Sequence, residues 1–152
     1  MTDKERAEIA KTWLMRSIGS RRYKREIERR LEEFTFASIA KYETDGSGKG
    51  TPRENEQETK MIEYSDLRKT LEGINRRLDA EDTITIRVIE AIRSETAELE
   101  RAILMARYIN MRTWDEIASS DFDEPLSNTQ AYRIHGKALI SMYKAMKEEG
   151  YA

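Results

Sequence analysis

The residues best suited to binding chemistry lie in the C-terminal third of the chain, where bases and acids occupy separate segments. Residues 127–147 contain no acid and four bases, which give a local charge of +4: Arg133, Lys137, Lys144 and Lys147. Residues 113–126 contain no base and five acids, which give −5: Asp115, Glu116, Asp121, Asp123 and Glu124. A solvated surface without a partner would mix the signs. Positive charge concentrated on one segment is typical of a surface that contacts phosphates.

Residues for catalysis or metal binding are scarce. The chain has no cysteine, which excludes disulfides, thiolate nucleophiles and cysteine-ligated metals. His135 is the single histidine, so a multi-histidine metal site is excluded. Adjacent carboxylates such as Asp115 and Glu116 diverge by about 100° on a helix and do not converge on a site. We therefore expect no enzyme, no catalytic residues, no metal and no cofactor.

The composition predicts an all-α protein. Of the 152 residues, 38% are hydrophobic and 37% charged, against about 45–50% and about 25% in average soluble domains. Long helices have this high ratio of surface to core, and two prolines and seven glycines are too few for the many turns of an all-β fold. No apolar run reaches the length of a transmembrane helix and no signal peptide opens the chain, so we expect a cytoplasmic protein without membrane contact.

Residues 1–93 are expected to form a long helical hairpin or coiled coil. Apolar residues recur every three or four positions over residues 3–42, with a break or kink near 17–20. A flexible glycine-rich loop over 44–54 separates this helix from a second one, whose apolar positions approach a heptad seam: Met61, Tyr64, Leu67, Leu71, Ile74 and Leu78. The alternating stretch 82–88 could form a strand in isolation, but we interpret it as helix. The two stripes pair either within one chain or between two chains.

Residues 16–30 carry seven bases and two acids, a local charge of +5. Three interpretations remain open for this cluster. It is a solvated helix face with ion pairs between neighbouring turns, a second surface for phosphate contacts, or a dock for an acidic partner.

Residues 94–152 have the layout of a helix-turn-helix domain. Ser94 is expected to cap a helix over 95–110 that carries Leu99, Ile103, Leu104 and Tyr108. Thr113 and Glu116 have the form of a capping box, which opens a short helix over 114–119. After a loop over 120–126, Ser127 and Gln130 form a second capping box, which opens a helix that runs to about Lys147. In helix-turn-helix proteins the last of three such helices enters the major groove of DNA.

The DNA-contacting residues should lie on this last helix, on the face opposite its apolar positions Ala131, Ile134, Ala138, Leu139 and Met142. In the first turns, Gln130 could read adenine and Arg133 could read guanine through paired hydrogen bonds. Lys137 and Lys144 suit phosphate contacts. The predicted DNA-binding residues are Asn128, Thr129, Gln130, Tyr132, Arg133, His135, Lys137 and Lys144, with Tyr132 and His135 at the margins of the face.

At these residues the chain resembles a known family. The stretch 102–118, with Leu104, Arg107-Tyr108 and Thr113-Trp114-Asp115-Glu116-Ile117-Ala118, is similar to the signature of phage late-gene transcription regulators of the ArpU and RinA type. The stretch 127–139, which contains Tyr132-Arg133-Ile134-His135-Gly136-Lys137-Ala138-Leu139, resembles its continuation. Both stretches also resemble region 4 of σ70-like factors. The loop over 119–126 is longer and more acidic than in that pattern, and no σ region 2 is present.

The resemblance implies a phage-derived, sequence-specific DNA-binding regulator, an activator of late genes that acts in the cytoplasm of a bacterial host. Its partners would be double-stranded DNA, host RNA polymerase as a candidate, and a second copy in a homodimer. Two alternatives remain open. One is a DNA-packaging protein like the small terminase subunit, and the other is a helical interaction scaffold that binds no DNA.

Overall fold

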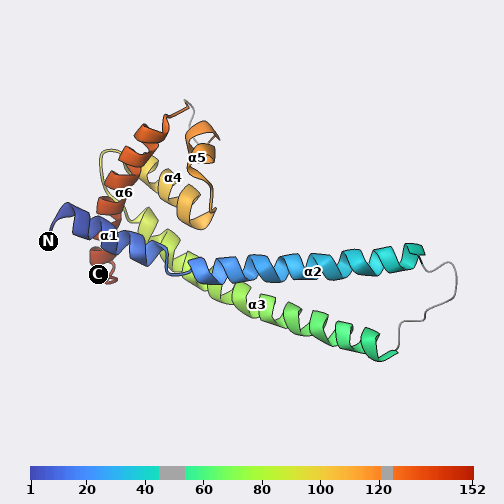
Figure 1. Ribbon diagram of the computed structural model, residues 1–152. Coiled ribbons are helices and arrows are strands. Elements are labelled where there is room, and N and C mark those ends of the chain that lie inside the picture. Colours follow the sequence, from blue (N-terminus) through green and yellow to red (C-terminus); the bar gives the residue numbers. More distant parts are fainter. Residues whose placement is uncertain (45–53, 121–124) are drawn as a thin grey trace. The chain divides into compact units, whose positions relative to one another are not determined.

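A computed structural model of the chain consists of helices and their connections, with no strand among the residues it describes. The backbone is described for residues 1–44, 54–120 and 125–152, and the side chains for residues 1–34, 56–119 and 125–152. The elements are α1 (Asp3–Leu14), α2 (Ile18–Thr44), α3 (Glu54–Glu90), α4 (Ala97–Leu104), the π-helical segment η1 (Met105–Ile109), α5 (Trp114–Ser120) and α6 (Asn128–Glu148) (Figure 1). The all-α prediction is confirmed, and residues 82–88 are helical. Most of the predicted linker, residues 45–53, and the acids at 121–124 lie outside the described residues.

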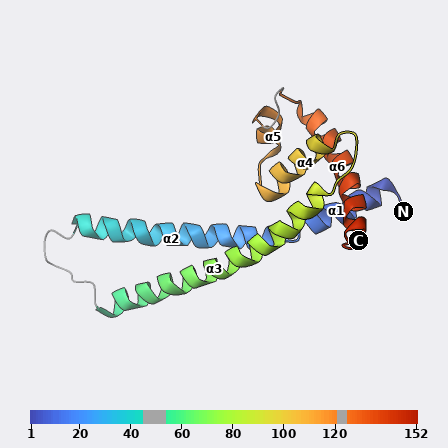
Figure 2. The ribbon, with the colours of Figure 1, turned by 180° about the vertical axis from the view of Figure 1, so that it is seen from behind.

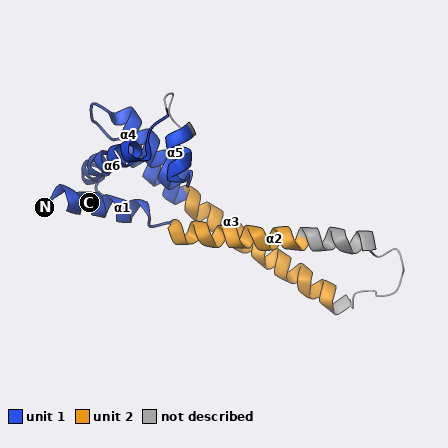
Figure 3. Cartoon of the chain, turned by 45° about the horizontal axis from the view of Figure 1, so that its top comes forward, with its two compact units in different colours: residues 1–17, 80–152 blue, residues 18–79 orange. Residues whose placement is uncertain are grey.

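The chain divides into two compact units (Figure 3). Unit 1 comprises residues 1–17 and 80–152, and unit 2 comprises residues 18–79. The predicted domain boundary at 93/94 therefore falls inside unit 1. The physical reason is shared burial: Ala10 and Leu14 of α1 and Val88 and Ile89 of α3 belong to the same hydrophobic core as the C-terminal helices.

Unit 1 is built around α6, which packs against α1, α4 and α5. Its largest fully buried side chains come from α3, α4, α5, α6 and the segment that follows α3: Val88, Ile89, Ile92, Ile103, Leu104, Ile117, Met142 and Met146. The inclusion of α1 corrects the expectation that all of residues 1–93 belong to the hairpin. The predicted break near 17–20 marks this change, because α1 ends at Leu14 and α2 begins at Ile18.

The helix α4 begins later than predicted and is capped differently. It starts at Ala97 after Thr96, whose side chain makes no capping hydrogen bond. Ser94, the predicted cap, instead donates from Oγ to the buried Glu100 carboxylate, with an oxygen–oxygen distance of 2.6 Å. Of the apolar residues on this helix, Leu99 is 42% exposed, whereas Ile103 and Leu104 are fully buried. The predicted capping by Ser94 was wrong, because the buried Glu100 carboxylate takes the Ser94 hydroxyl as its partner.

Unit 2 is an antiparallel pair of α2 and α3 within one chain, as both views show (Figures 1 and 2). Its buried side chains are Ile27, Ile74 and Leu78, with Leu31, Leu67 and Leu71 packed at the edge of this cluster. The guanidinium of Arg30 joins the helices through the Glu63 carboxylate at 3.1 Å. Two residues of the predicted stripes are exposed instead, Tyr23 by 55% and Met61 by 73%. None of the described helices combines the length and apolar composition needed to span a bilayer.

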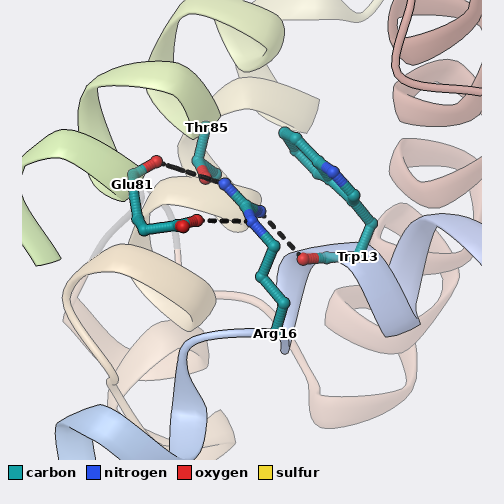
Figure 4. Close-up of polar contacts among 4 residues, drawn as sticks. All are labelled: Trp13, Arg16, Glu81 and Thr85. Atoms are coloured by element: carbon teal, nitrogen blue, oxygen red, sulfur yellow. Dashed lines mark hydrogen bonds and ion pairs between the residues drawn. The ribbon is translucent and has the colours of Figure 1, made fainter. Parts of the chain in front are cut away.

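Arg16 fastens the end of α1 to the last turns of α3 within unit 1 (Figure 4). Its Nε lies 2.6 Å from Glu81 Oε2, and its Nη2 donates to Thr85 Oγ1 at 2.8 Å and to the Glu81 carbonyl at 3.2 Å. Its Nη1 donates to the Trp13 carbonyl at 2.9 Å, and the guanidinium stacks 3.8 Å from the centre of the Trp13 ring. Only a planar group with several donors fills all these roles, so a lysine would not replace it.

We expect Arg16→Ala to destabilise unit 1 by about 1–3 kcal/mol, because hydrogen bonds to charged groups and the stacked ring are lost together. Urea unfolding followed by circular dichroism measures the loss. Arg93→Ala is the matched control, since Arg93 is exposed and makes no ion pair with a described residue. An equal effect of the two substitutions would contradict the role of Arg16 as a fastener.

Candidate nucleic-acid interface

The turn between η1 and α5, which is the first turn of the predicted helix-turn-helix unit, has a defined backbone geometry. The first helix ends as the π-helical segment η1, where the Asn110 N–H donates to the Met105 carbonyl at 3.0 Å. Met111 then adopts φ +54°, in the left-handed region, and the Arg112 N–H donates back to the Ala106 carbonyl at 2.9 Å. A left-handed residue followed by such a backward bond is a common way to end a helix. This turn changes the direction of the chain, so that α5 begins at Trp114.

The side chains of both predicted N-cap residues, Thr113 and Ser127, accept the expected backbone hydrogen bond, and the full capping box is shown at Ser127. The Glu116 N–H donates to Thr113 Oγ1 at 3.2 Å, and that hydroxyl donates to the Glu116 carboxylate at 3.1 Å. At the start of α6 the reciprocal pair is complete: the Gln130 N–H donates to Ser127 Oγ at 3.2 Å, and the Ser127 N–H donates to Gln130 Oε1 at 3.0 Å. These local bonds explain why α5 and α6 begin where the sequence predicts.

The buried face of α6 holds it in place. Ala131, Ala138, Leu139 and Met142 are buried as predicted, and Ile134 is half-buried. The exposed basic residues of the helix are Arg133, Lys137, Lys144 and Lys147. None of the four makes an ion pair within the part of the chain that the structure describes. The helix therefore presents its charge on the side opposite its core.

Four aromatic rings and one arginine gather where α6 meets η1 and α5. Trp114 meets the edge of Tyr132 at 4.9 Å between ring centres and that of His135 at 4.8 Å. Tyr108 stacks on His135 at 5.8 Å, and Tyr108 OH lies 2.8 Å from His135 Nε2. The guanidinium of Arg107 lies 5.0 Å from the Trp114 ring centre and donates to the Arg112 carbonyl. This aromatic cluster fixes the angle between α6 and the turn.

The cluster changes the interpretation of His135. Burial lowers the pKa of His135 from its ordinary value of 6.5 to about 4, and the charges of Lys11 and Arg107 act in the same direction. Burial also raises the pKa of Tyr108 to about 12. His135 is thus neutral at pH 7, half-buried and bonded to Tyr108. Because its ring stacks on Tyr108 and its Nε2 pairs with the Tyr108 hydroxyl, we propose a packing role for His135 in place of the predicted DNA contact.

Some of the other predicted residues make side-chain contacts within the protein, and the rest do not. Asn128 donates from Nδ2 to the Asp115 carboxylate at 3.1 Å, and Gln130 uses its amide oxygen in the cap. Tyr132 is 50% exposed but lies against Trp114. Thr129, Arg133, Lys137 and Lys144 are exposed, without a partner among the described residues. Four of the eight predicted residues are therefore available for contacts with a partner, and three of these four lie beyond the first turn of α6.

Sequence analysis did not assign a role to Arg107 or to α1 in this unit. Arg107 supports Trp114 from the preceding helix, and its position beside Tyr108 in the quoted signature was the available signal. Lys11 on α1 lies close enough to influence His135. Among the side chains that the structure describes, no three His, Asp or Glu gather closely enough to hold a metal ion.

Comparisons with protein-family models, with curated proteins and with solved structures found no match for this chain in any of the three.

We expect stability to fall as the pH drops from about 6.5 toward 4, because the unfolded chain protonates His135 while the folded chain keeps it neutral. The contribution of His135 to the free energy of unfolding is fully present above the pKa of the unfolded chain. Below that pKa the free energy of unfolding falls by at most about 1.4 kcal/mol for each pH unit. Because His135 is the single histidine, its ring signals in an NMR titration need no assignment. His135→Gln should remove this share of the pH dependence. A measured pKa near 6.5 would contradict its placement in the aromatic cluster.

Proposed function

We propose that the chain is a sequence-specific DNA-binding regulator that reads the major groove with the exposed face of α6. The observation that carries the proposal is that the two faces of this helix differ. One face is buried in the core of unit 1, and the other carries bases that make no ion pair with any residue the structure describes. The short α5 and the tight turn before it complete the three-helix layout of DNA readers.

Arg133 and Lys137 take different roles in this proposal. Arg133 lies in the second turn of α6, where helix-turn-helix proteins contact base edges, and its forked donors match the two acceptors of guanine. Lys137 and Lys144 lie one and three turns further along and would neutralise phosphates. Thr129 is the remaining unengaged polar side chain near the helix start. Asn128 and Gln130 would have to leave Asp115 and the Ser127 cap before they could read a base.

The role in transcription is supported by the resemblance of residues 102–118 and 127–139 to phage late-gene regulators and to σ region 4. On this proposal the protein acts in a bacterial host, and its N-terminal helices dimerise it or contact host RNA polymerase. The packaging alternative shares the DNA-binding unit but requires a ring of many copies.

Selection from random duplex DNA at two salt concentrations, followed by sequencing of the retained fraction, tests the proposal. An enriched motif supports a specific regulator. Retention without a motif, together with eight or more copies in native mass spectrometry, favours the packaging alternative. Absence of retention at both salt concentrations would overturn DNA binding and leave an interaction scaffold.

Substitution of the two bases should separate their roles. Arg133→Ala is expected to cost about 1–3 kcal/mol of binding free energy and to relax the preference at one base position. Lys137→Ala should weaken binding to all sequences alike and reduce the slope of log affinity against log salt by about 1. Lys4→Ala on α1 is the control for lost charge. Equal preference profiles for wild type and Arg133→Ala would show that α6 does not read bases through this residue.

Gly136 offers a separate test because the fold does not require it. A Cβ at this position in α6 would meet no atom within 4 Å, so Gly136→Ala should stabilise the helix by about 0.5–1 kcal/mol. Gly136 lies one turn after Arg133, so the added methyl group should weaken DNA binding if the backbone approaches DNA there. Thermal unfolding and duplex binding are measured on the same variant, with Gly73→Ala in α3 as the control, since its Cβ also meets nothing. Unchanged affinity would exclude close approach at this turn.

A further inference from the structure

The basic segment at the start of α2 is a charged surface that the proposed function does not use. Residues 18–30 carry six bases and two acids, a net charge of +4. The first turn of α2 contains no acid, whereas the first turn of α1 contains Asp3 and Glu5. Bases near the start of a helix are unfavourable, because the helix dipole places partial positive charge at that end. The charge of this segment therefore does not by itself stabilise the helix.

The two acids of this segment do not balance its bases. Glu26 pairs with Arg29 at 2.9 Å, and Glu28 lies 4.0 Å from the ammonium of Lys24. Two exposed bases remain that make no ion pair with any residue the structure describes: Arg22 and Arg25. Both acids lie within about one turn of these two arginines and yet pair with other bases. Ion pairs between neighbouring turns, the first interpretation of this cluster, therefore do not account for them.

Arg22, Arg25 and Arg29 form one stripe along α2, which we call the arginine stripe. Their spacings of three and four residues place them on the same face of the helix. Ile27 is buried in the seam with α3, and it lies about 200° around the helix from Arg25 and from Arg29. The stripe therefore points away from the seam. The pair between Arg29 and Glu26 is exposed, and such surface pairs contribute little, so Arg29 can exchange this partner for another anion.

The chemistry of the arginine stripe suits phosphate groups. A guanidinium is always charged in proteins, and its forked donors match two oxygens of one phosphate. Protein partners usually bury an apolar centre. Among the described side chains of α2, the exposed large apolar residue is Tyr23, which lies four residues before Ile27 and hence on the seam side of the helix. The stripe thus offers charge without an apolar centre, which favours a polyanion over a protein.

We propose that the arginine stripe of α2 is a second DNA-contacting surface, which binds the phosphate backbone of duplex DNA without reading its sequence. The choice of DNA rests on the function proposed above, which already brings duplex DNA to this chain. From Arg22 to Arg29 the helix rises about 10 Å. Duplex DNA carries one charge per about 1.7 Å of its axis, so several phosphates lie within that length. The stripe would supply affinity that depends on salt, while α6 supplies the sequence preference.

Binding of the full chain to a short duplex of random sequence, measured over a range of salt concentrations, tests the proposal. Arg22→Ala with Arg25→Ala should lower the affinity about tenfold at low salt and reduce the slope of log affinity against log salt by about 2, because two phosphate contacts are lost. Arg22→Lys with Arg25→Lys keeps both charges and should retain most of the affinity. An unchanged affinity and slope in the alanine variant would overturn the proposal.

The matched control lies on the other helix of unit 2. Lys69 and Arg76 on α3 are exposed, make no ion pair with a described residue, and share a face on which the exposed Glu72 lies between them. Lys69→Ala with Arg76→Ala removes the same charge from unit 2 and should leave the affinity and the slope nearly unchanged. An equal loss from both pairs would show that DNA responds to the net charge of the unit, and it would overturn the stripe as a binding surface.

Substitutions on α6 distinguish a failure of this proposal from a failure of the proposed function. In a chain that already carries Lys137→Ala and Lys144→Ala, loss of Arg22 and Arg25 should lower the affinity by the same further factor, because separate contacts contribute additively. An effect of the α6 substitutions alone would overturn the stripe and leave the proposed function standing. An effect of the stripe substitutions alone would support the stripe and contradict DNA binding by α6.

An acidic protein is the other partner that would fit a row of arginines, and polyglutamate is the probe for it. If Arg22→Ala with Arg25→Ala weakens the binding of polyglutamate but leaves duplex binding unchanged, the stripe docks an acidic protein and the proposal fails. Absence of duplex binding by the wild-type chain at low salt would overturn it as well. Circular dichroism of each variant checks that these exposed substitutions leave the helices folded.

Discussion

The close packing of one face of α6 is the constraint on which unit 1 depends. Ala131, Ala138 and Ala145 recur every seven residues, so they lie on one face two turns apart, and all three are buried. Small side chains there let α1, α4 and α5 approach the same helix, while Met142 and Met146 fill the space between them. Because this face is fully committed to packing, any partner of α6 must use the opposite face, where the bases lie. The core thus determines which side chains are available for recognition.

The aromatic cluster fixes the orientation of α6 relative to α5 and η1. Trp114 at the start of α5 contacts Tyr132 and His135 on α6, and Arg107 covers it from η1. A neutral histidine suits this position, because a charged ring would be desolvated beside the cations Arg107 and Lys11. In the proposed function, the cluster is a positioning device: it holds the angle of α6 without contacting DNA.

A feature could be predicted from the sequence when the residues that form it are close together in the chain. The N-cap hydrogen bonds at Thr113 and Ser127 join residues three positions apart, and both helix starts were located correctly. The inner face of α6 follows from helical periodicity and was also correct. By contrast, the partner of His135 is Tyr108, 27 residues away, and Arg16 reaches Glu81 across 65 residues. No local pattern identifies such pairs. The docking of α1 on α6 was missed for this reason, since its apolar stripe indicates only that some partner exists.

The same limit explains the hairpin. Periodicity predicted that the two stripes pair, and they do so at Ile27, Ile74 and Leu78, yet the stripe extends further than the burial that one chain provides. The apolar stripe of a helix reflects all the partners of that helix, within and between chains. The structure of one chain shows only the partners that lie within that chain. Among the described residues of unit 2, Leu31, Leu67 and Leu71 stay half-buried at the edge of the cluster. Periodicity alone identifies these positions as apolar but does not say how completely one helix covers the other.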